Sequence, residues 1–142
     1  MPPDSQRPAG VTAIAVLFSL AAIYLFAIGI VKLIAPEAVS LMSAGQLMYG
    51  LELAGPYMAM LIGSGWALVS WGLFRLHNWA RWTAMLVMTI GIAWLVPKIS
   101  MAELGVPLLW YGLQIALHAA AAWYMAQAPA VVDAFAANRQ QG

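Results

Sequence analysis

The 142-residue sequence contains no cysteine and very few charged residues. Without cysteine there is no disulfide, no thiolate metal site and no cysteine nucleophile. Charged residues make up 8% of the sequence, against about 25% in an average soluble domain. The formal net charge is +1, which argues against a nucleic-acid partner, because such a surface needs clustered lysines and arginines.

Four long apolar runs account for most of the sequence, in which 64% of the residues are hydrophobic. About 20 apolar residues in a helix cross the roughly 30 Å of a bilayer core. The sequence therefore predicts an all-α fold, an integral membrane bundle of four transmembrane helices in a single domain over residues 1–142. The predicted spans are residues 11–34, 56–76, 79–96 and 106–127.

The first run is longer than the apolar core of a signal peptide, so we interpret it as an uncleaved span. The connection 35–55 is too long for a tight turn. Within it, residues 36–54 fit a short interfacial helix, and the alternative is that residues 46–55 lengthen the second span. Residues 131–137 are a candidate second interfacial helix, and a disordered tail is expected at 138–142.

The distribution of cations predicts the orientation of the spans. The N-terminal tail, the connection between the second and third spans and the C-terminal tail together contain four arginines, whereas the opposite side has only Lys32 and Lys98. Because cytoplasmic segments are enriched in Lys and Arg, both termini are expected in the cytoplasm. The four arginines are Arg7, Arg75, Arg81 and Arg139.

Small residues recur at helical spacing along three of the spans. In lipid, helices associate by close backbone approach and by polar contacts, so such stripes mark helix-packing faces. Either they pack the bundle within one chain, or one stripe faces another subunit. The predicted packing residues are Ala15, Ser19, Ala22, Gly29, Ala59, Gly63, Ala67, Gly112, Ala116 and Ala120.

His118 is the best candidate for a cofactor-binding residue, because it lies near the middle of the fourth span, where ionisable groups are rare. Gln114 precedes it by one helical turn and is placed to select its tautomer. The alternatives are an axial ligand for a chlorophyll-type pigment or a haem, and a histidine that bonds a neighbouring helix. A haem held by two histidines of this chain is excluded by depth, because His77 lies in a connection. The sequence requires no cofactor.

The connection between the second and third spans is rich in arginine and tryptophan. Arginine heads reach lipid phosphates and tryptophan rings prefer the headgroup region, so this segment is predicted to anchor the chain at the membrane surface. The alternative is a docking surface for a cytoplasmic partner. The predicted anchoring residues are Arg75, Trp79, Arg81 and Trp82.

No enzyme motif is present. Ser64 has isoleucine, not glycine, two residues before it, so it lacks the elbow of an intramembrane serine protease. The sequence contains neither a zinc-protease motif nor a phosphate-binding loop. We therefore expect a protein that is not an enzyme.

Two segments, Arg7–Ala15 (RPAGVTAIA) and Trp71–Arg81 (WGLFRLHNWAR), resemble those of a loose group of small bacterial membrane proteins with four predicted spans. The resemblance extends over most of the chain. It implies the four-span architecture and implies no activity, since the function of the group is not established.

The leading hypothesis is a non-catalytic accessory subunit of a larger membrane complex of the respiratory or photosynthetic type. Its partners would be other membrane protein subunits and membrane lipids. The alternatives are a pigment- or haem-binding protein that uses His118, and a small homo-oligomeric carrier of a solute or lipid.

Overall fold

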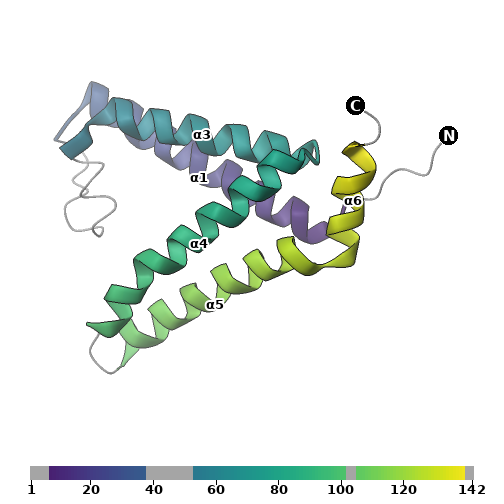
Figure 1. Cartoon of the computed structure of the whole chain (residues 1–142). Helices are drawn as coiled ribbons and strands as arrows, with labels where there is room; N and C mark the ends of the chain where they lie inside the picture. The colour runs from purple at the N-terminus through teal and green to yellow at the C-terminus, as the bar shows by residue number, and fades with distance from the viewer. Residues whose placement is uncertain (1–6, 38–52, 102–104, 140–142) are drawn as a thin grey trace. The chain divides into compact units, whose positions relative to one another are not determined.

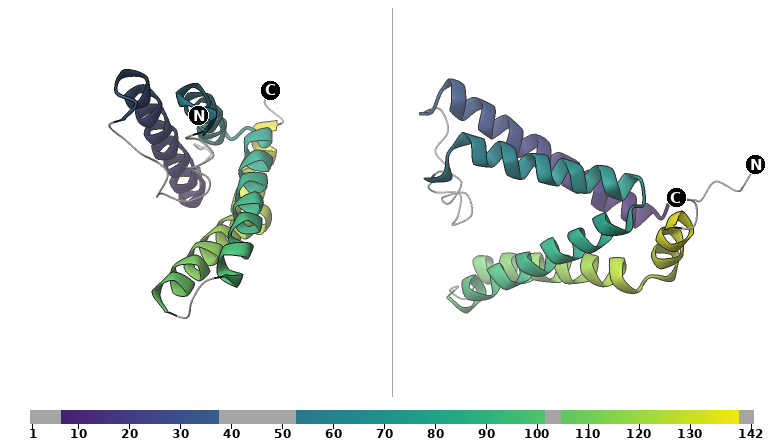
Figure 2. Two further views of the ribbon diagram at one scale, coloured as in Figure 1. Left: turned by 90° about the vertical axis from the view of Figure 1, so that its left-hand side faces the viewer. Right: turned by 45° about the horizontal axis from the view of Figure 1, so that its top comes forward.

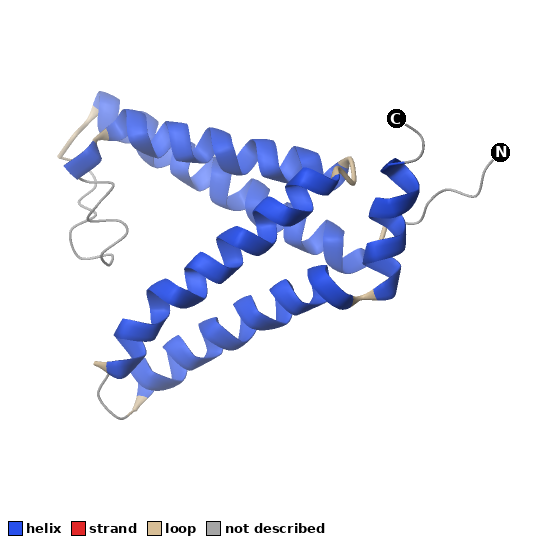
Figure 3. Cartoon of the chain, viewed as in Figure 1, coloured by secondary structure: helices blue, strands red, loops and turns tan. Residues whose placement is uncertain are grey.

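The computed structural model of the chain describes residues 7–37, 53–101 and 105–139. Within these ranges the regular structure is entirely α-helical, without strands (Figures 1 and 3). The helices, labelled as in Figure 1, are α1 (Ala9–Ile34), α3 (Pro56–Phe74), α4 (Asn78–Ser100), α5 (Val106–Gln127) and α6 (Pro129–Arg139). The fold class is all-α, as the sequence predicts.

Three of these helices, α1, α3 and α4, are each long and apolar enough to cross a membrane. Helix α5 meets that test only together with α6, from which it is bent by 53°. The described part of the chain thus offers three spans, or four if the bent pair counts as one. The helix α5 coincides with the predicted span 106–127, and α1 begins slightly before the predicted span 11–34.

Helix α4 continues through Pro97 to Ser100, instead of ending at residue 96 as the sequence analysis expects. Proline removes one backbone N–H, and it is tolerated near the end of a helix because few further hydrogen bonds depend on that position. The Met101 N–H still donates to the Pro97 carbonyl at 3.2 Å, which closes the last turn. One proline near the end of a helix is therefore insufficient to stop it.

Helix α3 ends at Phe74, before the predicted limit at residue 76, because a tight turn leads directly into α4. The His77 N–H donates to the Gly72 carbonyl at 2.8 Å, and the Leu76 N–H donates to the Leu73 carbonyl at 3.1 Å. These bonds form a Schellman motif, which satisfies carbonyls that the helix end leaves open. Leu76 occupies its left-handed position with φ 54°, and burial of its side chain compensates for that conformation.

The predicted interfacial helix at 36–54 falls mainly on residues 38–52, which lie outside the described residues. At the other end of the chain, helix α6 begins at Pro129 and runs to Arg139, into the segment expected to be disordered. Val131 and Phe135 of α6 are buried. The buried apolar side chains therefore hold α6 against the protein. The prediction of a frayed interfacial helix does not include this packing.

The chain divides into two compact units, one of residues 15–71 and the other of residues 1–14 with 72–142. In the first unit α1 and α3 run antiparallel and side by side (Figures 1 and 2). A Cβ added at Gly63 would lie 3.3 Å from the Ala22 carbonyl oxygen. Such close approach of two backbones is possible only with small residues in the interface.

Apolar side chains fill the rest of the contact between α1 and α3. Leu25, Ile28 and Ala59 form a buried cluster, against which the partly buried side chain of Trp66 packs. The ring of Trp66 also meets that of Phe18 in a tilted arrangement, with 5.6 Å between the ring centroids. Tilted aromatic pairs at this separation are favourable beyond the area they bury.

Two serines connect α1 to α3 by hydrogen bonds. The Ser70 hydroxyl donates to the Ala15 carbonyl at 2.7 Å, and the Ser19 and Ser70 hydroxyl oxygens are 2.6 Å apart. Because Ser70 has one hydroxyl hydrogen and uses it for the carbonyl, Ser19 must be the donor to Ser70. Only 3% of Ser70 is exposed. This chain of bonds fixes the register of the two helices.

In the second unit α4 and α5 run antiparallel, and α6 packs against both (Figure 2). The buried residues of α4 recur at intervals of about one helical turn, so they form one face of that helix. They are Ala80, Ala84, Met88 and Leu95.

Replacing Ser70 with alanine should destabilise the α1–α3 pair by about 1 kcal/mol, since an intramolecular hydrogen bond contributes about 0.5–1.5 kcal/mol to stability. The measurement is the unfolding free energy from titration with a denaturing detergent in mixed micelles. Ser64→Ala is the matched control, because the Ser64 hydroxyl is exposed and bonds only the Met60 carbonyl of its own helix. Equal losses in the two variants would contradict the proposed role of Ser70.

Candidate functional site

The imidazole of His118 is held by its own helix, α5. Its Nδ1 atom lies 2.7 Å from the backbone carbonyl oxygen of Gln114. Because a carbonyl can only accept, Nδ1 carries the hydrogen of this bond, and in the neutral ring Nε2 then has the lone pair. The backbone carbonyl of Gln114 therefore selects the tautomer of the neutral ring, and a role for the Gln114 side chain stays a prediction.

The other edge of the His118 ring faces helix α4 at Gly91. A Cβ added at Gly91 would lie 2.9 Å from the Cδ2 atom and 3.1 Å from the Nε2 atom of His118. The imidazole thus lies in the space that the missing side chain of Gly91 leaves on α4. A flat macrocycle coordinated by Nε2 would have to displace α4 from this edge, so the arrangement favours helix packing over ligation.

The stripes of small residues differ in where the structure places them. Within the first unit, five of the predicted packing residues are buried, Ser19 is half-buried, and Ala67 is exposed. On α5 the situation is reversed, since Ala116 and Ala120 are exposed and no atom lies within 4 Å of a Cβ added at Gly112. The buried residues are Ala15, Ala22, Gly29, Ala59 and Gly63.

Arg81, one of the predicted membrane-surface anchors, bonds the end of α5, and its anchoring role stays a prediction. Its Nε atom donates to the Met125 carbonyl at 2.8 Å and its Nη2 atom donates to the Ala126 carbonyl at 3.1 Å. In a continuous helix the Met125 carbonyl would accept from residue 129, but Pro129 has no N–H. The Ala126 carbonyl would accept from residue 130, which lies beyond the break. The guanidinium also lies 5.9 Å from the centroid of the Phe135 ring. Arg81 therefore joins α4 to α5 and α6.

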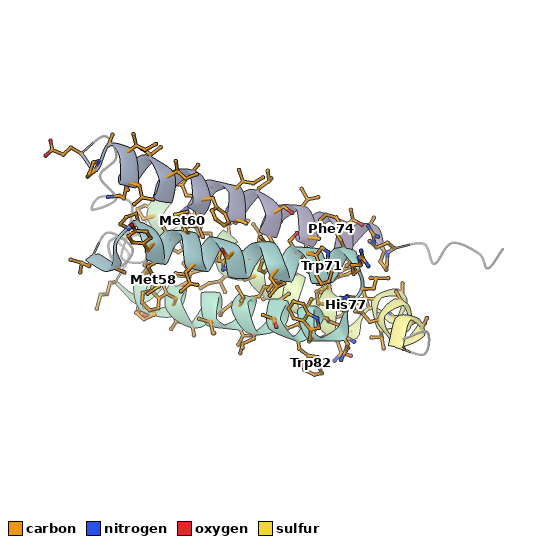
Figure 4. The ribbon with its side chains drawn as sticks, turned by 90° about the horizontal axis from the view of Figure 1, so that it is seen from above. Met58, Met60, Trp71, Phe74, His77 and Trp82 are labelled. Carbon is orange, nitrogen blue, oxygen red and sulfur yellow. The ribbon has the colours of Figure 1, made fainter. Side chains whose placement is uncertain are left out.

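The other predicted anchoring residues surround the turn between α3 and α4. Trp79 and Trp82, at the start of α4, are both exposed, as is Arg75. Figure 4 shows Phe74, His77 and Trp82 at the same end of α3 and α4, with Trp82 on the outer side of α4. The surface-anchoring role of Arg75, Trp79 and Trp82 stays a prediction that this arrangement permits.

Sequence reasoning missed three participants in these contacts: Gly91, Phe135 and Arg7. The guanidinium of Arg7 lies 5.6 Å from the centroid of the Phe74 ring, far from it in sequence. The contact of Gly91 could have been predicted, since this glycine of the third predicted span lies opposite His118 if adjacent spans are antiparallel. No local pattern identifies Phe135 or Arg7, because both contacts join segments that are distant in the chain.

Among the described residues, no group of three or more His, Asp or Glu side chains is placed to hold a metal ion. Comparison of the chain with protein-family models, with curated proteins and with solved structures gives no match.

Replacing Gly91 with alanine should destabilise the α4–α5 contact by about 1–2 kcal/mol, as is typical of overpacked sites. Gly112→Ala is the control, because open space surrounds that position, and it should leave the unfolding free energy unchanged or slightly raised. In the double variant Gly91→Ala, His118→Ala the loss should be smaller than the sum of the single losses. Additive losses would show that the two residues do not interact.

Replacing Arg81 with glutamine should cost about 2 kcal/mol, because hydrogen bonds from a charged donor are lost and two carbonyls are left open. Hydrogen exchange, followed by mass spectrometry, should become faster in the last turn of α5 and throughout α6. Lys98→Gln changes a cation near the other end of α4 and is the control. Unchanged exchange in the Arg81 variant would be incompatible with the bonds to Met125 and Ala126.

Proposed function

We propose that this chain is an integral protein of a bacterial cytoplasmic membrane, with four spans and both termini in the cytoplasm. The lengths and apolar character of α1, α3 and α4, and of α5 taken with α6, support the four crossings. The turn at Leu76 and the end of α5 also have their carbonyls satisfied by the protein itself. Such internal pairing is what a protein in a bilayer needs at its helix ends, because the hydrocarbon core offers no hydrogen-bond donors.

Within that membrane we propose that the chain acts as a non-catalytic accessory subunit of a larger complex, of the respiratory or photosynthetic type. The observation that supports this role is the contrast between its small-residue stripes. Those of α1 and α3 are mostly buried against each other, whereas Ala116 and Ala120 of α5 are exposed and Gly112 has open space beside it.

The exposed stripe has the composition that membrane helices use for close packing. Gly and Ala let two backbones approach, and lipid tails gain nothing comparable from contact with them. Large apolar side chains flank the stripe: Leu113 and Leu117 are each more than half exposed, at 52% and 61%. We therefore propose that a helix of another subunit packs along this face of α5.

The alternatives have less support. The pigment-binding role rests on His118, whose Nε2 edge packs on Gly91, so no surface is prepared for a macrocycle. The carrier role has no specific contact that favours it. Both stay predictions from the sequence.

The accessory role predicts that leucine at Ala116 and Ala120 together separates the chain from its complex, because two enlarged side chains hold the partner helix away. The measurement is native mass spectrometry of the tagged chain, extracted gently from its own membranes. Unmodified chain should appear in an assembly of defined mass with other subunits, and the Ala116→Leu, Ala120→Leu variant should appear alone.

The control is Ala27→Leu, which enlarges an exposed alanine on α1. Both variants should remain with the membranes after an alkaline carbonate wash, which separates loss of the partner from loss of insertion. A bare monomer or a homo-oligomer of the unmodified chain would disprove the accessory role. Release of the unmodified chain by the wash would disprove its membrane location.

A further inference from the structure

Two exposed arginines from distant parts of the chain lie near the end of α3. Arg7 precedes α1, and its guanidinium lies over the ring of Phe74 with 5.6 Å to the centroid. Arg75 follows Phe74 directly. Both arginines are exposed, and all three residues belong to the same compact unit. The stacking therefore holds the Arg7 guanidinium against the residue that directly precedes Arg75. Two cations in one neighbourhood repel each other, and an anion that binds both relieves this repulsion.

The backbone that carries Arg75 is held in one conformation. The two hydrogen bonds of the Schellman motif at Leu76 close the turn on both sides of it. Trp79 braces the turn from α4, since its ring would be 2.7 Å from a Cβ added at Gly72. The backbone position of Arg75 is therefore set before any ligand arrives, which removes the backbone part of the entropy lost on binding.

The electrostatic surroundings add to the positive charge of this end. The N-termini of α1 and α4 both lie in this unit, near Arg7 and the turn, and neither helix has an acidic residue in its first turn. Helix N-termini carry partial positive charge. Asp133, exposed on α6, is the only carboxylate side chain among the described residues of this unit. The negative end of α5 is already matched by Arg81.

Exposed tryptophans beside the arginines indicate where the anion comes from. Trp79 is 43% exposed and Trp82 is 62% exposed at the start of α4. Indole rings prefer the headgroup region of a bilayer, so the two arginines should lie at the depth of lipid phosphates. A soluble anion would need no such aromatic surroundings.

We propose that Arg7 and Arg75 together bind the phosphate of an acidic phospholipid headgroup, with Phe74 as the residue that positions Arg7. Arg81 takes no part, because its guanidinium is bonded to α5. This site rests on the proposed membrane location and is independent of the accessory role.

The experiment is a titration of the purified full chain in uncharged detergent with phosphatidylglycerol and, separately, with phosphatidylcholine, followed by native mass spectrometry. The first phosphatidylglycerol should bind at least tenfold more tightly than phosphatidylcholine. Arg7→Gln and Arg75→Gln should each weaken it about fivefold, as expected for one cation near an anionic headgroup. Phe74→Leu should weaken it less, and Arg7→Lys, which keeps the charge, should weaken it less than Arg7→Gln.

Lys98→Gln, near the other end of α4, is the matched control and should leave the affinity unchanged. Circular dichroism of each variant verifies that the helices are intact. Millimolar inorganic phosphate should fail to displace the lipid, and efficient displacement would reassign the site to a soluble anion and overturn the proposal. Equal affinity in the Arg7→Gln, Arg75→Gln and unmodified chains, or no preference for phosphatidylglycerol, would also overturn it. Loss of a protein partner alone would change none of these results.

Discussion

The contact of Arg81 with the end of α5 is the interaction on which the arrangement of α4, α5 and α6 depends. Pro129 has no N–H, so it ends α5 and leaves the carbonyls of Met125 and Ala126 without their helical donors. In an apolar medium each open carbonyl would cost several kcal/mol. Arg81 supplies both donors from the first turns of α4, and Phe135 lies against its guanidinium. One side chain therefore permits the bend and connects three helices.

Close packing in this chain repeatedly sets a glycine of one segment against a large ring of another. Each ring occupies the space that a Cβ would take, so the backbone and the ring are in van der Waals contact. Such contacts contribute dispersion energy, because many atoms of the ring and of the backbone meet at close range. The pairs in the second unit are Gly10 with Tyr124, Gly72 with Trp79, and Gly91 with His118.

Much of the fold follows from local features of the sequence. The apolar runs and the prolines at 56 and 129 locate the helices, and α5 coincides with its predicted limits. The same reasoning predicts that α4 ends before Pro97, but the helix continues past it. The effect of a proline depends on how many helical hydrogen bonds follow it, and few follow Pro97. Sequence reasoning also missed the contact of Arg81 with α5, because the carbonyls that accept from Arg81 lie more than 40 residues away.

The sequence by itself determined the helical class, the approximate limits of the helices and the position of His118 within one of them. Only the tertiary structure decided which face of each helix is used: that the small residues of α1 and α3 meet, that those of α5 stay exposed, and that His118 rests on Gly91. The physical reason is that these helices are apolar on all sides. Hydrophobic periodicity therefore does not distinguish the face of a helix that packs inside. That face is selected by contacts between distant residues, each of which requires a close fit or a hydrogen bond.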